Sequence, residues 1–194
     1  MNRQPPSSLR ATAPTTYFLT FSCDGRRHWL ADPAVRDALM QLLRDDCATG
    51  QIALHAWVIM TNHVHTLASG ALQPALPWVG SVKKRFALRR RPMLRSLLPP
   101  EAVHGVFWLP GGGYPFRVWS HRKYTEKVRY IHENPVRSKL CARMSHWRWS
   151  SAIDVYGGQR QDAPRLSARP ESLVDLLWWN QPCLQPRPAE SRAR

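Results

Sequence analysis

The order of strand-like and helix-like segments most limits how this chain of 194 residues can fold. Segments rich in β-branched, aromatic or apolar residues predict strands at 15–23, 54–60, 64–68 and 103–109. Segments with apolar residues at helical spacing lie between them, at 33–47 and from 73 to about 88. Strand, helix, strand, strand, helix, strand is the order of the ferredoxin-like split βαβ unit. We therefore expect an α+β fold whose antiparallel sheet carries these helices on one face and leaves the other face open for a ligand.

The chain is strongly basic, with a formal net charge of +15 and a pI of about 10.8. Such a charge attracts polyanions, with nucleic acid as the first candidate and an anionic membrane as the second. Residues 1–14 lack the apolar core of a secretory signal, and no segment is apolar enough to span a bilayer. We therefore expect no membrane partner and a cytoplasmic location, at the nucleoid if the source is bacterial. The four cysteines form no Cys-x-x-Cys pair, which argues against a zinc ribbon or a disulfide framework.

Two histidines flank one apolar residue at the start of the third predicted strand. Side chains alternate between the two faces of a strand, so His63 and His65 point the same way and Val64 points the other way. Two imidazoles side by side on a rigid strand form half of a site for a divalent metal ion. Pairs of half-buried polar residues also occur at this spacing in ordinary strands, so the pattern gains weight only beside a second stretch.

That second stretch lies in a third predicted helix. The helix should begin at Ser120, a candidate N-cap, and run to Asn134, where Pro135 limits its extension. At about 100° per residue, one stripe of this helix is apolar and should face the core. The residues of the stripe are Tyr124, Val128 and Ile131.

One tyrosine of this helix lies off the apolar stripe. Tyr130 shares its face with Asn134, Lys123 and Lys127. The ordinary interpretation is an amphipathic tyrosine at the edge of a helix. The functional interpretation is a nucleophile, whose phenol has a reference pKa of about 10 and needs nearby lysines or a metal ion to favour its ionised form.

Together these stretches resemble the single-tyrosine HUH transposases, and in particular the REP-associated tyrosine transposases. The sequence MTNHVH at 60–65 resembles the HUH motif of that family, and YIHENPVR at 130–137 resembles its tyrosine helix. Further stretches resemble the family's first strand, its first helix and the segment after the tyrosine helix, at 20–22, 31–36, 147–151 and 156–157. The resemblance spans about residues 15–158.

The resemblance implies roles for single residues. Tyr130 would attack a phosphate of single-stranded DNA and leave a 5′-phosphotyrosine and a free 3′-hydroxyl. His63 and His65 would be the metal pair, and Asn134 would give a third contact to Mg²⁺ or Mn²⁺. The substrates would be imperfect DNA hairpins of the REP type with a short single-stranded flank, cut and rejoined without ATP. The protein would act as a monomer or a homodimer.

The chain also departs from the family. Thr61 stands where the family usually has proline, and the stretch 111–116 is unusual where a shorter aromatic segment is expected. Tyr114 and Tyr124 are further phenols, but neither has an asparagine four residues later that is followed by proline. Tyr130 therefore ranks above both as the nucleophile.

The second predicted helix and the segment after it are rich in lysine and arginine. Seven such residues lie between 83 and 95: Lys83, Lys84, Arg85, Arg89, Arg90, Arg91 and Arg95. No acidic residue lies between Ala68 and Pro100, so we expect that internal salt bridges cannot absorb their charge. A solvated face is one interpretation. We favour phosphate contacts, made by the first six of these residues together with Lys123 and Lys127, which position DNA without reading its sequence.

These observations predict a lead-in over 1–14 without fixed structure, a catalytic domain over 15–158, and a linker with a C-terminal tail over 159–194. The principal hypothesis is a metal-dependent transposase that cuts and transfers single-stranded hairpin DNA through Tyr130. The alternatives are a hairpin-binding DNA or RNA protein without chemistry and a metal-dependent phosphodiesterase that uses water.

Overall fold

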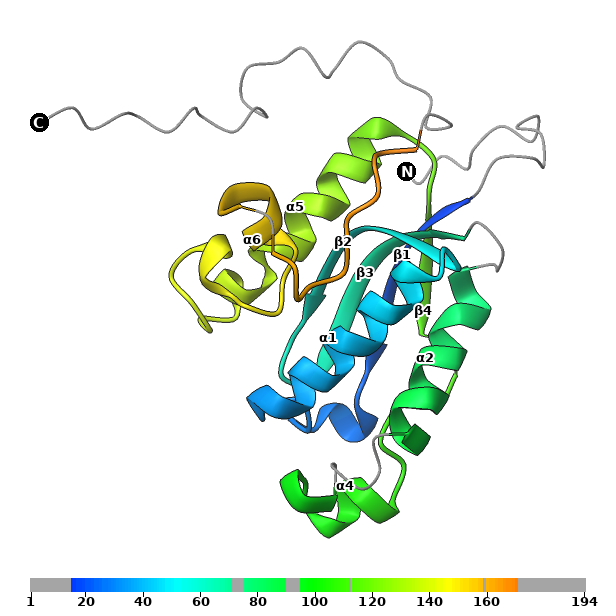
Figure 1. The fold of residues 1–194 in the computed structure, drawn as a ribbon, viewed down its shortest axis with the longest axis vertical. Coiled ribbons are helices and arrows are strands. Elements are labelled where there is room, and N and C mark those ends of the chain that lie inside the picture. The colour runs from blue at the N-terminus through cyan, green and yellow to red at the C-terminus, as the bar shows by residue number, and fades with distance from the viewer. Residues whose placement is uncertain (1–14, 71–74, 90–94, 112, 159, 171–194) are drawn as a thin grey trace, which may run out of the picture.

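The computed structural model describes residues 15–70, 75–89, 95–111, 113–158 and 160–170. Its elements in chain order are β1 (Thr16–Ser22), η1 (Asp24–Arg26), α1 (Pro33–Ala48), β2 (Ile52–Ile59), β3 (His63–Gly70), α2 (Ala75–Arg89), α4 (Pro100–His104), β4 (Tyr114–Val118), α5 (His121–Arg137), η2 (Met144–His146) and α6 (Ala152–Tyr156). Figure 1 shows α1 and α2 side by side against the sheet.

The strands form one antiparallel sheet in the order β2-β3-β1-β4. The strands β2 and β3 form a hairpin, and the mixed α+β fold is confirmed. The register aligns residues from three strands in one row, because Thr20 of β1 pairs with His65 of β3 on one side and with Tyr114 of β4 on the other. Directly paired residues share a face of the sheet, so these three side chains stand on the same face.

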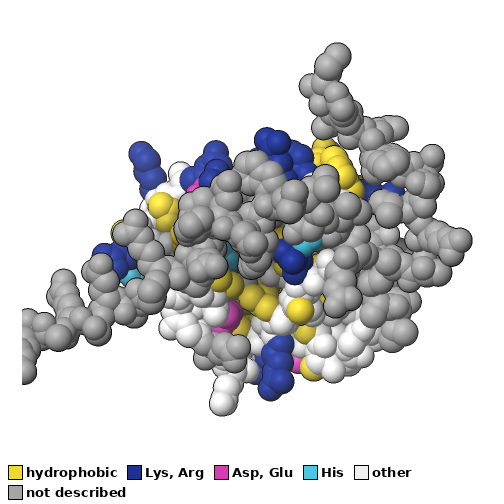
Figure 2. Space-filling model, turned by 90° about the horizontal axis from the view of Figure 1, so that it is seen from above, with side chains coloured by type: hydrophobic (Ala, Val, Ile, Leu, Met, Phe, Trp, Pro, Cys, Tyr) yellow, Lys and Arg dark blue, Asp and Glu magenta, His cyan; other side chains and the backbone are white. Residues whose placement is uncertain are grey.

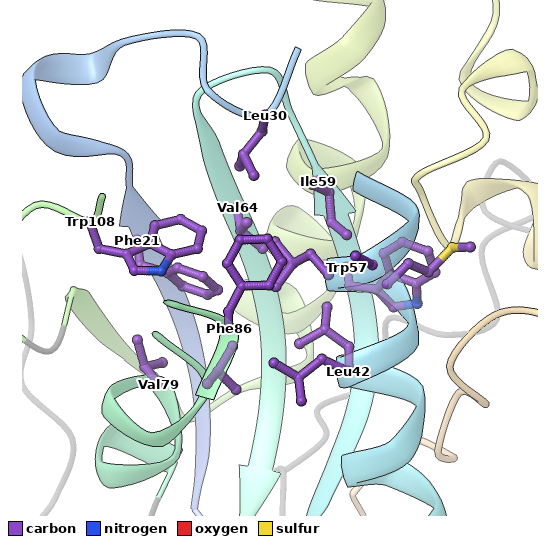
Figure 3. Packing of buried hydrophobic residues seen from close by; sticks show 14 of the residues in the cluster. Phe21, Leu30, Leu42, Trp57, Ile59, Val64, Val79, Phe86 and Trp108 are labelled. Atoms are coloured by element: carbon purple, nitrogen blue, oxygen red, sulfur yellow. The ribbon is translucent and has the colours of Figure 1, made fainter. Parts of the chain in front are cut away.

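The larger core fills the space between one face of the sheet and the helices α1 and α2. Asp32 caps α1, because its carboxylate accepts a hydrogen bond from the backbone N–H of Ala34 at 2.7 Å. Figure 3 shows side chains from the sheet and both helices meeting in this cluster, among them Phe21, Trp57 and Phe86, each fully buried. This packing makes the sheet a rigid support for whatever stands on its other face.

The opposite face of the sheet carries α5. The stripe predicted to face the core does so: Ile131 is fully buried, and Tyr124 and Val128 pack beside it. This second cluster contains Phe18 and Leu67 of the sheet and extends to Trp147 after the helix. The face expected to remain open for a ligand is therefore half covered by the helix that carries Tyr130.

Two predicted element bounds are wrong. The fourth strand is β4, Tyr114–Val118, and not 103–109, part of which forms the end of α4. The apolar residues Phe107 and Trp108 are buried in the core, and Trp108 forms an isolated antiparallel bridge with Cys23 just after β1. The helix α5 runs past Pro135 to Arg137, because a proline in the last turn removes only one hydrogen bond of the helix.

The described part of the predicted linker packs against the domain. Along 160–170, Ser167 donates its backbone N–H to the carbonyl of Leu54 at 2.7 Å, and Leu166 forms a parallel bridge with Leu54. The whole predicted lead-in, 1–14, and the predicted tail from 171 to 194 lie outside the described residues. None of the helices within the described ranges is both long and apolar enough to cross a membrane.

Candidate active site

The two histidines of β3 face each other as the strand pattern predicts. The Nε2 atoms of His63 and His65 lie 3.1 Å apart. Each outer nitrogen has a fixed neighbour: Asn62 Oδ1 lies 2.6 Å from Nδ1 of His63, and Thr20 Oγ1 lies 2.7 Å from Nδ1 of His65. Because the amide oxygen of Asn62 can only accept, Nδ1 of His63 carries the proton and its Nε2 has a free lone pair.

The imidazole of His65 is buried, that of His63 is half-buried, and both are neutral. Burial lowers the pKa of His63 to about 4, and the nearby charges of Arg26 and His28 act in the same direction. Burial also lowers the pKa of His65 to about 3, with further contributions from His63 and Lys127. Neutral imidazoles are the form that binds metal ions, so the pair is ready to act as ligands at physiological pH.

The tyrosine of α5 reaches the same place. Tyr130 packs edge-on against His65, with ring centroids 5.3 Å apart, and against Phe18 at 5.7 Å. An open cavity of about 710 Å³ lies above this group, and its walls include both histidines, Tyr130 and Asn134. The structure thus brings all four residues predicted for the site to one cavity, although 65 residues separate His65 from Tyr130.

Segments distant in sequence fix α5 on the sheet. His132 Nε2 lies 2.9 Å from Ser151 Oγ, which in turn accepts a hydrogen bond from the backbone N–H of Trp57 in β2. Trp147 donates its indole N–H to the carbonyl of Ile59 at 3.0 Å. The segment after the tyrosine helix therefore ties that helix to the strand beside the histidines.

Two cations border the cavity. The guanidinium of Arg137 lies 5.7 Å from the centre of the Tyr130 ring, and Arg26 lines the wall near His63. A third cation, Lys127, lies one turn before Tyr130 on α5, and its ammonium is 5.1 Å from the Phe18 ring. The cavity therefore has the positive rim that a phosphate group requires.

The donor atoms at the cavity fit a divalent metal ion. Two nitrogens at neighbouring corners of an octahedral ion, each at about 2.1 Å, would lie about 3 Å apart, close to the separation found here. The described residues contain no cluster of three His, Cys, Asp or Glu side chains. A third ligand from the protein would therefore be an amide or phenol oxygen, which Asn134 or Tyr130 can supply.

The basic helix α2 corrects part of the sequence interpretation. Lys83 is only 8% exposed, and its ammonium donates to the carbonyls of Leu109 and Gly111, each at 2.7 Å. Arg85 forms a two-pronged ion pair with Asp46 of α1, at 2.6 and 2.5 Å. The inference that no acid neutralises this helix is wrong for Arg85, because its partner comes from a different helix. Neither cation is free to contact a phosphate.

The other predicted DNA contacts have different surroundings. Lys84 is exposed on α2, while the side chain of Arg89 and all of Arg90 and Arg91 lie outside the described residues. Lys123 pairs with Glu126 at 2.7 Å, and Lys127 lies 3.3 Å from the same carboxylate. On the side of the molecule drawn in Figure 2, lysine and arginine side chains cover more of the described surface than acidic ones.

The sequence interpretation missed several residues of the cavity. Thr20, Arg26 and Arg137 contribute to its walls, and so does Tyr114, which had been ranked only as a weaker nucleophile. Thr20 lies on β1 and Tyr114 on β4, and only the register of the sheet aligns them in one row with His65. No local sequence pattern predicts which residues of other strands will be aligned with His65. The position of Arg137, two turns after Tyr130 on one helix, was the one signal that the sequence offered.

The fold has a counterpart among solved structures. No family model and no curated protein sequence matches the chain. A REP-associated tyrosine transposase bound to a REP hairpin matches 92% of this chain and 100% of its own, with 20% identity and a TM-score of 0.54. A candidate transposase from Deinococcus radiodurans matches 69% of this chain and 97% of its own, with 25% identity and a TM-score of 0.47. On the first of these matches, the chain has the fold of the REP-associated tyrosine transposases.

Proposed function

We propose that this protein cuts and transfers single-stranded DNA through a covalent bond to Tyr130. The observation that carries the proposal is the meeting of Tyr130, His63, His65 and Asn134 at one open cavity with a positive rim. The fold shared with a transposase that binds a REP hairpin supports a hairpin with a single-stranded flank as the substrate.

The reaction needs no outside source of energy. The phenol oxygen of Tyr130 attacks the phosphorus of a phosphodiester, and the bond from phosphorus to the 3′ oxygen breaks. The phenolic proton is lost and the departing 3′ oxygen gains one, which leaves a 5′-phosphotyrosine and a free 3′-hydroxyl. Attack by another 3′-hydroxyl reverses these steps and joins a new strand, because the phosphotyrosine keeps the energy of the broken bond.

Protein groups around Tyr130 prepare it for this step. The edge contacts with His65 and Phe18 hold the ring in one orientation at the cavity wall. Arg137 and Lys127 place positive charge where the phenol and the phosphate develop negative charge. Orientation and fixed charge are the two contributions that a protein scaffold can make to a phosphoryl transfer.

The residues that would hold the metal ion are His63, His65 and Asn134. A divalent ion bound there would polarise the phosphodiester and stabilise the charge of the transition state. Of the two ions expected from the resemblance, Mn²⁺ suits a pair of imidazole nitrogens better, because Mg²⁺ prefers oxygen ligands.

An adduct assay tests the proposal. The protein is incubated with single-stranded hairpin DNA from the flanks of its own gene, labelled on the 3′ side of the cut, with Mn²⁺ or with EDTA. We expect a protein band that carries the label on a denaturing gel with Mn²⁺ and is absent with EDTA. Tyr130→Phe should abolish the band, whereas Tyr156→Phe, a half-exposed phenol that does not line this cavity, should keep it.

The other outcomes identify the alternatives. An adduct that survives in Tyr130→Phe would reject the assignment of the nucleophile. Cleavage to a free 5′-phosphate without an adduct would indicate a phosphodiesterase that uses water. Tight binding of the hairpin without any cleavage would indicate a binding protein.

A further inference from the structure

The helix α5 leaves part of the sheet face uncovered beside the candidate active site. It packs over β2 and β3, where Ile131 is fully buried, whereas the start of β4 at the sheet edge is exposed. Among the described residues, Tyr114 is the most exposed large apolar side chain, at 67%. An exposed ring of this size next to a cavity is accessible to a ligand that enters the cavity.

Tyr114 belongs to the cavity itself. It pairs with Thr20 across the sheet, and Thr20 contacts His65, so the ring stands in the same row as the metal-binding pair. The cavity that contains Tyr130 also includes Tyr114 in its wall. A nucleotide whose phosphate lies at Tyr130 therefore has this ring within reach of its base or of the neighbouring base.

A tight approach of the backbone fixes the position of Tyr114. The preceding residue, Gly113, has a φ of +87°, and a Cβ atom there would lie 2.4 Å from the carbonyl oxygen of Thr20. Only glycine allows this contact between the loop and β1. The start of β4, and with it Tyr114, is thus set against the strand that supports His65.

A second ring and a cation continue the surface away from the cavity. Phe116 lies two residues after Tyr114 on the same face of β4, which puts the two side chains about 6.6–6.8 Å apart along the strand. The ammonium of Lys127 lies 4.6 Å from the Phe116 ring, and Trp119 packs beside that ring at 5.3 Å. Flat rings that alternate with a positive charge are the usual surface for single-stranded nucleic acid.

We propose that Tyr114 stacks on the unpaired base next to the scissile phosphate and that Phe116 and Lys127 receive the adjoining nucleotide of the same strand. This inference rests on the proposed function and adds a binding site for the single-stranded flank. Stacking tolerates different bases because every base has a flat face, so the site fixes the position of the strand and not its sequence.

The test compares two versions of the same hairpin, one with a five-nucleotide single-stranded flank and one blunt, by fluorescence anisotropy without metal. For the wild type we expect tighter binding of the flanked hairpin. Tyr114→Ala should weaken binding of the flanked hairpin by roughly 5- to 100-fold and leave binding of the blunt hairpin unchanged. Tyr114→Phe keeps the ring and should retain most of the difference, and Leu88→Ala, an exposed apolar residue of α2, is the control.

A second measurement identifies the stacked base. We place 2-aminopurine at each position of the flank in turn, since stacking on an aromatic ring quenches its fluorescence. One position should be quenched by the wild type, released in Tyr114→Ala and quenched again in Tyr114→Trp. Equal affinity of wild type and Tyr114→Ala for the flanked hairpin, or quenching that does not depend on residue 114, would overturn the inference.

The two proposals fail in different ways. If the wild type binds the flank through Tyr114 but forms no adduct, the proposed chemistry fails and the binding site stands. If Tyr114→Ala changes neither affinity nor quenching while the wild type forms an adduct, only the binding site fails. Loss of the adduct in Tyr114→Phe would show that the phenol oxygen of Tyr114, and not its ring, is required. A change in sedimentation of Tyr114→Ala without a change in binding would assign the ring to self-association.

Discussion

The helices α2 and α5 are both rich in cations and lie on opposite faces of one sheet, yet their charges serve different ends. On α2, Lys83 donates to two backbone carbonyls and Arg85 pairs with Asp46. On α5, Lys127 lies over the rings of Phe18 and Phe116 beside the cavity, and its ammonium is 3.3 Å from the carboxylate of Glu126. Lys83 and Arg85 thus hold the fold together, whereas Lys127 lies beside the candidate site.

This difference shows that the density of positive charge along a sequence does not locate a binding surface. A lysine or arginine contributes to phosphate binding only if its charge remains free in the folded protein. The partner of Arg85 is Asp46 of α1, 39 residues away in sequence. A partner of Lys83 is the carbonyl of Leu109 in the segment before β4, 26 residues away. Experiments that compare the two faces can therefore test this assignment.

The largest expected effect is on stability, at the α2 face. Arg85→Met should lower the free energy of unfolding by roughly 2–3 kcal/mol, because among the described residues it leaves the carboxylate of Asp46, itself 3% exposed, with the indole N–H of Trp78 as its remaining side-chain donor. Urea unfolding measures the loss, and Lys84→Met, the exposed neighbour, is the control. An unfolding free energy equal to that of the control would show that the ion pair does not support the fold.

At the α5 face, the largest effect should be on metal affinity. Thr20→Val removes the hydroxyl that lies 2.7 Å from Nδ1 of His65 and should weaken Mn²⁺ binding by about 10- to 100-fold, because the imidazole loses the partner that fixes its tautomer. Thr66→Val is the matched control, since Thr66 is fully buried on β3 and its hydroxyl has no hydrogen-bond partner among the described residues. Calorimetric titration measures both. Equal affinities would mean that Thr20 does not orient His65.

The sequence predicted the α5 face well because its signals are local. Alternation places His63 and His65 on one face, helical spacing separates Tyr130 from the buried stripe, and one turn links Tyr130 to Asn134. These relations hold within a single element and survive any arrangement of the rest. The same reasoning gave the order of the first five predicted strands and helices.

The sequence predicted poorly whatever depends on contacts between elements. The strand β4 is an exposed edge strand with a proline, so it lacks the alternation that marks a half-buried strand. The apolar residues 103–109 looked more like a strand only because the core buries several of them. The pairing of Arg85 with Asp46 and the place of Tyr114 in one row with Thr20 and His65 follow from packing and register, which no local pattern encodes.

The two faces should also differ in their response to pH. Every described histidine with a lowered pKa contacts the α5 side of the sheet or lies on α5 itself: His55, His63, His65 and His132. For His55, burial lowers the pKa below 6.5, so the unfolded chain binds more protons than the folded one as the pH falls below that value. Stability should therefore be full above pH 6.5 and decrease below it.

A substitution isolates the share of one histidine. His55→Gln keeps a polar group near Ser69 Oγ, which lies 2.9 Å from Nε2, but cannot take up a proton. The decrease in the urea midpoint between pH 7 and pH 5 should be smaller in this variant than in the wild type. An identical decrease in both proteins would show that His55 does not contribute to the pH dependence. If the decrease is smaller in His55→Gln, the other three histidines can account for the decrease that remains.

The smallest expected effect separates the two lysines most directly. Lys127→Ala should reduce the slope of log affinity against log salt by about 0.7 for the flanked hairpin, because one phosphate contact is lost, whereas Lys83→Met should leave the slope unchanged. Lys83→Met should instead lower the free energy of unfolding by about 1–3 kcal/mol, since the carbonyls of Leu109 and Gly111 lose their buried donor. Anisotropy titrations between about 50 and 200 mM salt measure the slopes. If Lys83→Met reduced the slope as much as Lys127→Ala, the cations of α2 would have to reach DNA despite their internal partners, and the division of labour between the two faces would be wrong.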